Sequence, residues 1–316
     1  MMRAYAARRL GAGLLQIAAV VTIVHLLTSV LPGDAAVVVL GENATDAQRE
    51  ALRASWGLDR PWGEQFLDWL GGLVHGDLGT SLRTGRPVTA DLADELAGTA
   101  VLAAVTLACV IPLAVVLGVV SGARPGSRTD RTLNTALVIL HAIPEFALGM
   151  FLVAVFALEW GWFPATAAGL SGFSLAEQPA VLVLPVAVLV CTRLCALARQ
   201  IRIGVAEARE AEYATHLRVL GVPERTVLLR TVVPNGLAPA VQQVARTVDG
   251  LLGGVVVVEA LFGLTGVGAG FVEAVKARDL PVVQGYAVLF VVTTVVVNVA
   301  ADVAARRLVP QREVVA

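Results

Sequence analysis

The sequence predicts an all-α polytopic membrane protein with six transmembrane helices and a small helical extracytoplasmic insertion. The first observation is composition, because 57% of the 316 residues are hydrophobic and only 16% are charged. The mean hydropathy of +0.76 is also too high for a soluble domain. The second observation is a series of apolar segments, each long enough to cross a bilayer at roughly 20 residues. The third is the position of arginine in the short connections, which predicts an orientation.

The first apolar segment runs from Leu10 to Leu31 and follows an arginine-rich start. A signal peptide has a similar start but a shorter apolar core of roughly 7 to 15 residues. We therefore interpret residues 1–31 as an uncleaved N-terminal transmembrane helix. Five later spans, all within a five-helix core of residues 99–316, are expected at about Thr99–Gly122, Leu133–Leu158, Ala180–Leu197, Leu237–Phe262 and Val282–Ala305.

Arginine marks one side of the membrane. It occurs before the first span, between the second and third, between the fourth and fifth, and after the sixth, at Arg3, Arg8, Arg9, Arg124, Arg128, Arg131, Arg199, Arg202, Arg209, Arg218, Arg225, Arg230, Arg306, Arg307 and Arg312. The connection 159–179 on the other side has neither Arg nor Lys, and among the short connections only Lys276 and Arg278 go against the pattern. Because short loops rich in basic residues stay in the cytoplasm, both termini are expected there. The expected location is the cell membrane (inner or plasma membrane) of a prokaryote.

The longest stretch outside the membrane, residues 32–98, falls on the extracytoplasmic side of this topology. Thr45 or Asp46 can cap a helix that ends at Gly57, since a short polar side chain satisfies the first amides and glycine suits the stop. A second helix is expected from about Pro61 to Val74. The tryptophans of this small cap serve either as anchors at the lipid interface or as contacts for a partner.

A polar, arginine-rich segment, Glu207–Gln242, interrupts the apolar second half of the chain. We call it the 207–242 segment. It predicts two short helices around a break, with Glu207 and Glu210 early in the first helix, where acids are favoured. Gly221 permits the helix to stop and Pro223 suits the first turn of the next helix. Composition alone leaves two interpretations open, namely a compact element that docks on a partner protein and an ordinary cytoplasmic loop.

Several residues of this segment stand in a known order, namely Glu212, Tyr213, Ala214, Arg218, Gly221, Arg230, Asn235 and Pro239. With them the segment resembles the EAA motif of the membrane subunits of ABC importers, whose loop forms a coupling helix in a groove of a separate ATPase. The resemblance implies that Glu212 and Gly221 shape the coupling helix, and that Arg218 and Arg230 contact the ATPase. His216-Leu217 and Val219-Leu220 depart from the family pattern.

The rest of the chain extends the resemblance through the blocks LPGD at 31–34, GLDRPWGEQFLDWLGGLVHGDLGTSLRTGRPV at 57–88, IPEF at 143–146, GWFPA at 161–165 and RDLPVVQG at 278–285. These blocks resemble the first permease subunit (dipeptide permease B-like) of binding-protein-dependent dipeptide, oligopeptide or nickel importers. The resemblance implies the type I ABC importer permease fold. The implied partners are a second homologous permease, two ATPase subunits carrying ATP and Mg, and an extracytoplasmic solute-binding protein. Departures at Glu145, Thr265 and Leu280 leave the substrate open.

Polar residues inside the expected spans are candidates for a translocation path, because such residues are costly in lipid and usually face the bundle interior or water. His141 and Glu145 are four residues apart and predict either a local hydrogen-bonded pair or a pair that faces the path. Arg246 and Asp249 are three apart and predict either an ion pair or path-lining residues. Asn298, in the last span, completes this set.

Other functions are excluded or left without support. The net charge of -1 and the lack of any basic-aromatic patch argue against nucleic acid as a partner. The only lysine, Lys276, is not part of a phosphate-binding loop, and no hydrolase or metalloprotease motif occurs, so we expect no catalytic, cofactor or metal site in this chain. An intramembrane enzyme lacks a credible nucleophile and base. A stand-alone secondary transporter or channel remains the alternative, and it predicts internal repeats or broken helices in matching halves.

Overall fold

A computed structural model describes residues 2–30, 35–41 and 44–308, and within these ranges the chain is built from helices. An isolated antiparallel bridge joins Thr80 and Pro87. The elements are α1 (Met2–Val30), α2 (Ala35–Leu40), α3 (Asp46–Ser55), α4 (Trp62–Val74), α5 (Val88–Gly122), α6 (Arg128–Ala142), α7 (Glu145–Leu152), η1 (Val153–Glu159), α8 (Ser174–Glu177), α9 (Pro179–Glu210), α10 (Glu212–Val219), α11 (Glu224–Val227), η2 (Leu228–Val232), α12 (Val233–Leu237), α13 (Ala240–Phe262), α14 (Val267–Ala277) and α15 (Leu280–Leu308). The predicted all-α class is confirmed.

The helices form two compact units. The first unit contains Met1–Thr99, Ala168–Ser174 and Leu264–Val295, and the second contains Ala100–Ala167, Leu175–Gly263 and Val296–Ala316. The long helices α5 and α15 each contribute residues to both units. The 207–242 segment therefore belongs to the second unit, whereas the cap formed by α2, α3 and α4 belongs to the first.

Among the described residues, 4 helices are long and apolar enough to cross a membrane, or up to 6 if each of two bent pairs counts as one span. The single-helix candidates are Gly11–Thr28, Val88–Gly122, Pro179–Glu210 and Leu280–Val303. The bent pairs are Arg128–Ala142 with Glu145–Glu159, at 94°, and Val255–Phe262 with Val267–Ala277, at 84°. Up to six spans are thus available, as predicted, but the third is a bent pair. The fifth, Val255–Phe262 with Val267–Ala277, begins and ends later than the predicted Leu237–Phe262. The LPGD block (31–34) and Arg312 lie outside the described residues.

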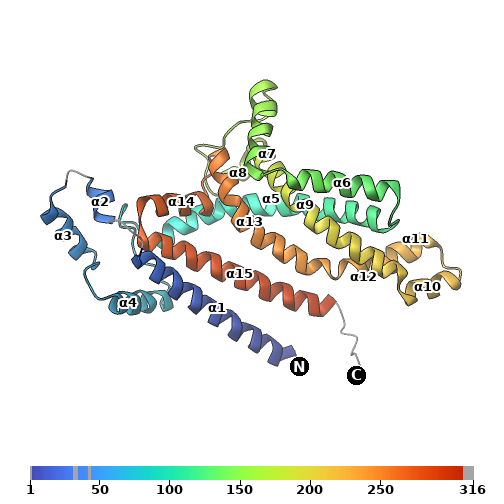
Figure 1. Cartoon of the computed structure of the whole chain (residues 1–316), viewed down its shortest axis with the longest axis horizontal. Helices are drawn as coiled ribbons and strands as arrows, with labels where there is room; N and C mark the ends of the chain where they lie inside the picture. Colours follow the sequence, from blue (N-terminus) through green and yellow to red (C-terminus); the bar gives the residue numbers. More distant parts are fainter. Residues whose placement is uncertain (1, 31–34, 42–43, 309–316) are drawn as a thin grey trace. The chain divides into compact units, whose positions relative to one another are not determined.

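The bend in the third span occurs at Ile143 and Pro144. Ile143 is extended, with φ -78° and ψ 125°, because the ring of a following proline disfavours the helical region for the residue before it. Pro144 then occupies the N-cap position of α7. Figure 1 shows α7 rising steeply from the end of α6. Residues before and after this bend consequently do not share one helix face.

In the first unit, both predicted cap helices are confirmed. Thr45 caps α3 with a complete capping box, in which Gln48 N–H donates to the Thr45 hydroxyl and the Gln48 side chain accepts from Thr45 N–H. Gly57 has φ +68°, as a helix stop requires. The aromatic rings of α4 pack around His25 of α1 at centroid distances of 5.1 to 5.7 Å. The next helix, α5, begins at Val88 rather than at the expected Thr99.

In the second unit, α9 occupies the centre and packs against α6, α7, α12 and α13. The closest approach is between glycines, because a Cβ atom added to Gly204 of α9 would lie 2.2 Å from the carbonyl oxygen of Gly236 in α12. A side chain at either position would push these two helices apart. The glycine pair therefore seats the C-terminal part of the 207–242 segment on α9, around a core that includes Leu197, Ile201, Val205, Val227 and Val232.

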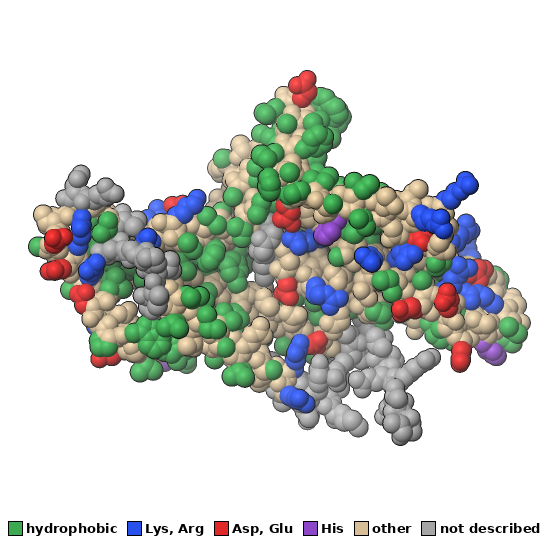
Figure 2. Space-filling model, in the orientation of Figure 1, with side chains coloured by type: hydrophobic (Ala, Val, Ile, Leu, Met, Phe, Trp, Pro, Cys, Tyr) green, Lys and Arg blue, Asp and Glu red, His purple; other side chains and the backbone are tan. Residues whose placement is uncertain are grey.

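The surface of the second unit separates two kinds of side chain. Figure 2 shows hydrophobic side chains covering the projecting α7, where Phe146, Met150 and Phe151 are more than half exposed. Lys and Arg side chains gather instead at the end formed by α10, α11 and the α5–α6 turn. An apolar exterior beside a basic end suits a segment that crosses lipid and ends at a cytoplasmic surface.

Candidate functional site

The 207–242 segment contains the predicted break, but its first helix starts later than expected. Helix α9 continues through Glu207 to Glu210, so these two acids belong to α9 and not to the first short helix, which corrects the prediction. Ala211 is extended, with φ -63° and ψ 149°, and separates α9 from α10. Gly221, at φ +78°, ends the first short helix, and Pro223 is the N-cap of α11. The segment is a helix, a tight turn and a second helical stretch through η2 and α12.

One face of this segment is anchored in the core of the second unit. Ala214 and Val227 are fully buried, at 0% exposure, and Tyr213, Leu217 and Val222 pack against the same core as α9. The opposite side is apolar and exposed at the end of α10, where Val219 is 80% and Leu220 64% exposed. Buried apolar contacts thus hold one face of the segment against the core, while two large aliphatic side chains are exposed at the end of α10.

Beside this exposed end, a shallow hollow runs along α10. Its lining residues are Glu210, Glu212, Tyr213, Thr215, His216 and Val219. Glu212 is in the first turn of α10, where a carboxylate stabilises the helix through its dipole. Of the predicted coupling residues, Glu212, Gly221 and Arg230 are exposed, Tyr213 is half-buried and Ala214 is buried.

Arg218 points inward, toward the segment itself. Its Nε donates to Glu224 Oε2 at 2.9 Å, and its Nη1 donates to the carbonyl oxygen of Arg209 at 2.9 Å. Arg209 Nη2 donates to the other oxygen of the same carboxylate, Glu224 Oε1, at 3.2 Å. We call Arg209, Arg218 and Glu224 the clamp. The hydrogen bond from Arg218, aided by both positive charges, lowers the pKa of the Glu224 carboxyl below its ordinary value, which favours the charged carboxylate in the clamp.

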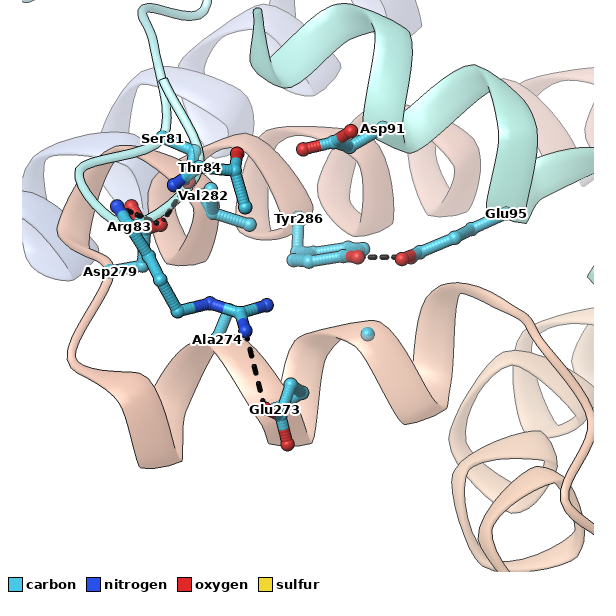
Figure 3. Close-up of a pocket in the computed structure, with 11 residues that line it drawn as sticks. Ser81, Arg83, Thr84, Asp91, Glu95, Glu273, Ala274, Asp279, Val282 and Tyr286 are labelled. Atoms are coloured by element: carbon cyan, nitrogen blue, oxygen red, sulfur yellow. Dashed lines mark hydrogen bonds and ion pairs between the residues drawn. The ribbon is translucent and has the colours of Figure 1, made fainter. Parts of the chain in front are cut away.

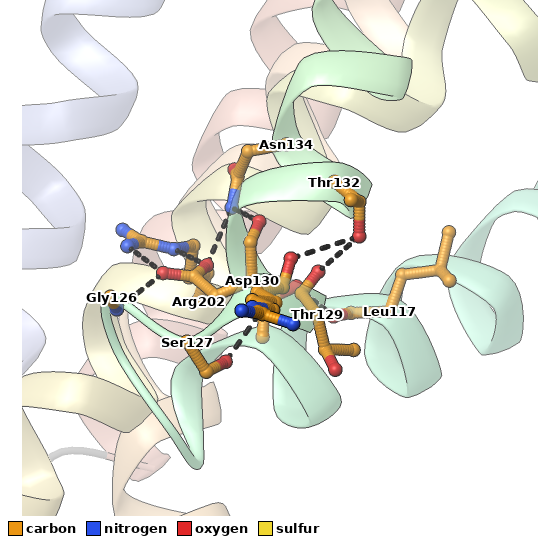
Figure 4. A network of polar contacts seen from close by, with 10 residues as sticks. Leu117, Gly126, Ser127, Thr129, Asp130, Thr132, Asn134 and Arg202 are labelled. Atoms are coloured by element: carbon orange, nitrogen blue, oxygen red, sulfur yellow. Dashed lines mark hydrogen bonds and ion pairs between the residues drawn. The ribbon is translucent and has the colours of Figure 1, made fainter.

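A second polar network ties α9 to the α5–α6 turn (Figure 4). The Asp130 side chain is 3% exposed and accepts from Arg202 Nε at 2.5 Å and from Arg202 Nη2 at 2.7 Å. The same carboxylate accepts from the backbone amide of Gly126 at 2.8 Å and from Asn134 Nδ2 at 2.6 Å. Sequence reasoning used Arg202 only as one positive charge in a loop and did not select Asp130. The local signal in the sequence that points to Asp130 is the N-cap residue Ser127, three positions earlier.

Two of the predicted path residues, His141 and Glu145, contact α9 but not each other. His141 Nδ1 lies 3.0 Å from the carbonyl oxygen of Thr192, and Glu145 accepts from Arg193 Nη2 at 2.9 Å. The expected pairing of His141 with Glu145 is wrong, because the helix breaks between them and the i, i+4 rule holds only within one helix. Both residues instead contact successive positions of α9.

The expected ion pair between Arg246 and Asp249 is likewise wrong within the described residues. Arg246 is exposed and donates from Nε to Gln243 Oε1 at 2.9 Å. Asp249 Oδ2 accepts from Asn298 Nδ2 at 2.8 Å, which joins α13 to α15. Thus Asp249 and Asn298 form a pair, whereas Arg246 stands apart. Whether any of these side chains lines a path stays a prediction.

A small pocket in the first unit gathers polar residues that the sequence did not single out (Figure 3). It lies among the 81–84 loop, the start of α5, α14 and the start of α15, and Figure 3 shows Tyr286 pointing to Glu95 and Arg83 to Glu273. Asp279, 3% exposed, accepts from the Ser81 hydroxyl at 2.5 Å and from the amides of Leu82 and Arg83 at 3.1 and 3.3 Å. These contacts fasten the loop to α15.

Replacing Asp279 with Asn should release this loop. The amide would place an N–H group against a set of donors, and hydrogen bonds to a charged acceptor are each worth roughly 1.5–3 kcal/mol. We expect trypsin to cleave after Arg83 at least about tenfold faster in the variant, because each 1.4 kcal/mol of opening free energy is a factor of ten. Mass spectrometry of the fragments measures the rate. Asp59→Asn, at an exposed side chain of the same unit, is the matched control, and equal cleavage rates in both variants would contradict the assignment.

Comparison with known proteins places the whole chain among membrane transport components. The family described as binding-protein-dependent transport system inner membrane component matches residues 114–314, and the corresponding N-terminal family matches residues 1–103. The glutathione transport system permease protein GsiC of Pectobacterium atrosepticum is 31% identical over 283 residues, covering 90% of each chain. The oligopeptide transport system permease protein AppB of Bacillus subtilis is 30% identical over 305 residues, covering 96% of each chain.

Proposed function

Because this chain belongs to the family of binding-protein-dependent transport system inner membrane components, we propose that it forms half of the path through which an ATP-driven importer takes up short peptides. The chain is a permease subunit with the helical type I importer fold. The names of two relatives state their cargo, glutathione for one and oligopeptides for the other, and the proposal extends this class of cargo to the present chain. The observation that carries the proposal is the pair of family matches, at residues 1–103 and 114–314.

The site of ATPase docking is the end of α10. The exposed Val219 and Leu220 side chains offer apolar area that binding would bury, and the core contacts of Ala214 hold them in place. The carboxylates of Glu210 and Glu212 line the adjacent hollow and suit a basic partner surface. ATP and Mg are held by two separate ATPase subunits, because this sequence has no phosphate-binding loop of its own.

The basic end of the second unit faces the cytoplasm in this proposal. The exposed arginines at this end include Arg124, Arg128, Arg131, Arg199 and Arg225, and short loops rich in arginine are retained on the cytoplasmic side. Both termini then lie in the cytoplasm, and α3 and α4 lie on the outer face. There they are available to an extracytoplasmic solute-binding protein that delivers the peptide.

A second, homologous permease completes the path. This chain has two polar pairs, Glu145 with Arg193 and Asp249 with Asn298. They supply charged and amide groups to the half of the path that this chain forms. Charged side chains are costly in lipid, so they favour an interior or water-lined position over the lipid-facing surface. Such groups match the charged ends and peptide bonds of the proposed cargo.

Reconstitution into proteoliposomes tests the proposal. The chain is assembled with the second permease and the two ATPases, and the binding protein is added outside with a labelled tripeptide. We expect uptake that requires both ATP and the binding protein and that stops when the ATPases carry an inactive phosphate-binding loop. Uptake of labelled glutathione and of a labelled amino acid, measured in the same way, shows which class of solute is carried.

The chain reconstituted alone is the decisive comparison. Because the energy source is expected on partner subunits, the isolated chain should carry no peptide under a proton or sodium gradient. Gradient-driven uptake by the chain alone would overturn the proposal in favour of a secondary transporter. ATP-dependent uptake of the amino acid but of neither peptide would leave the assignment as a permease intact and would contradict the assignment of peptides as the cargo.

A further inference from the structure

The backbone gives the 207–242 segment only a weak direct connection to α9. At Ala211 the chain is extended and the helical hydrogen-bond ladder is interrupted, so α10 is not a continuation of α9. A rigid α-helix transmits force along its axis, whereas a single extended residue is a hinge that absorbs rotation about φ and ψ. Movement of α10 therefore has to reach α9 through contacts other than this link.

The clamp supplies such contacts. Glu224, the first residue of α11, accepts from Arg218 of α10 at 2.9 Å and from Arg209 of α9 at 3.2 Å. Arg218 also donates to the backbone carbonyl of Arg209 at 2.9 Å. One carboxylate thus connects α9, α10 and α11, and it closes a ring of contacts around the hinge at Ala211.

The clamp also reaches the second and third spans. Arg209 Nη1 donates to the backbone carbonyl of Ala123, in the turn between α5 and α6. Asp130, in the first turn of α6, is held by Arg202, about two helical turns before Arg209 on α9. Through Arg209, the position of Glu224 is therefore linked to α9 and to the α5–α6 turn together.

Such contacts are poorly suited to a stabilising role. Glu224 is 50% exposed, and the two arginine side chains are 32% and 30% exposed, so water screens the ion pairs and their contribution to folding is small. Their geometry is nevertheless specific, since both carboxylate oxygens are used and both arginines also bond a backbone carbonyl. An interaction that fixes relative position with little effect on stability is what a transmission element requires.

We propose that Glu224 is a positioning residue, which transmits movement of the ATPase-docking end of α10 to α9 and the α5–α6 turn. This inference rests on the proposed function. When the clamp is intact, displacement of α10 moves three helices as one body. When it is broken, α10 keeps the apolar contacts of Ala214, Tyr213 and Leu217 with the core but loses its polar connection across Ala211. ATP hydrolysis in the docked partner then continues with less of the movement that carries peptide across.

Glu224→Gln tests the proposal in the complete reconstituted importer. The amide keeps the size of the side chain and removes the charge that holds two arginines. ATP hydrolysis and peptide uptake are measured in the same vesicles. We expect the number of peptides carried per ATP to fall about tenfold, within the usual range of coupling between sites, while the hydrolysis rate and ATPase retention change by less than about twofold. Glu224→Asp should restore part of the ratio.

Two further variants make the outcome decisive. Glu207→Gln applies the same change to an exposed acid of α9 and should keep the wild-type ratio. Arg209→Gln breaks the clamp from α9 and should reproduce the lowered ratio, which keeps the test valid if the Glu224 variant folds poorly. An unchanged ratio in both clamp variants overturns the proposal. Loss of bound ATPase would assign Glu224 to docking and also overturn it. Failure of the wild-type assembly to couple ATP to uptake would instead reject the proposed function.

Discussion

Replacing Gly221 with proline should abolish ATP-driven uptake while leaving the protein inserted in the membrane. Gly221 has φ +78°, and its amide donates to the carbonyl oxygen of Arg218 at 2.9 Å. Proline is fixed near φ -65° and has no N–H group, so it can satisfy neither requirement, at a cost of roughly 3 kcal/mol or more. The turn between α10 and α11 would open, and Val219 and Leu220 would lose their fixed position. Uptake measured in proteoliposomes should fall at least about a hundredfold, because 1.4 kcal/mol corresponds to a factor of ten.

The control for this prediction is Gly221→Asn. Asparagine is among the residues that tolerate a positive φ, and it retains the amide, so most of the uptake should remain. Gly221→Ala should fall between the two variants, since a Cβ atom in the left-handed region costs roughly 1–2 kcal/mol. Pull-down of the ATPases should track uptake across the series. Wild-type uptake in the proline variant would show that the turn has no part in coupling.

Local features of the fold could be predicted from the sequence because each depends on residues a few positions apart. The capping box of Thr45 and Gln48 and the stops at Gly57 and Gly221 depend on backbone geometry that neighbouring residues decide. The number of available spans followed from hydropathy. The bend at Pro144 did not follow from hydropathy, because a hydropathy average reports how apolar a window is and carries no information on the direction in which the helix runs. The signal for this bend is Pro144 itself, because its ring disfavours the helical region for the residue before it.

The candidate site was predicted in part for the same reason. Gly221 and the exposed Glu212 belong to one short motif, so their positions could be expected. The pairs that organise the interior join residues far apart in the chain, such as Glu145 with Arg193 and Asp249 with Asn298. Spacing along one helix could not reveal these pairs, and it wrongly joined residues that happened to be three or four apart. Arginines counted for topology, among them Arg202 and Arg209, proved to be structural contacts as well.

Replacing Arg202 with methionine should destabilise the second unit more than any exposed arginine substitution. Asp130, 3% exposed, would keep two neutral donors but lose its two charged hydrogen bonds, at 2.5 and 2.7 Å. Leaving one charge of a buried pair uncompensated costs roughly 3–5 kcal/mol. The melting temperature of the purified protein in detergent should fall by several degrees, and the α5–α6 turn should become accessible to trypsin. Arg131→Met changes an exposed arginine of the same region and should melt close to the wild type.

The double variant Asp130→Asn/Arg202→Met separates charge from packing. Asparagine is neutral and its carbonyl oxygen can still accept from the Gly126 amide, which the carboxylate contacts at 2.8 Å. If the single variant is unstable because a buried charge lacks its partner, removing that charge should recover most of the lost melting temperature. Additive losses in the double variant would contradict this cause and assign the instability to lost packing of the arginine side chain. Recovery would establish that the contact between α9 and the α5–α6 turn, which Arg209 extends toward the clamp, depends on charge pairing within the protein.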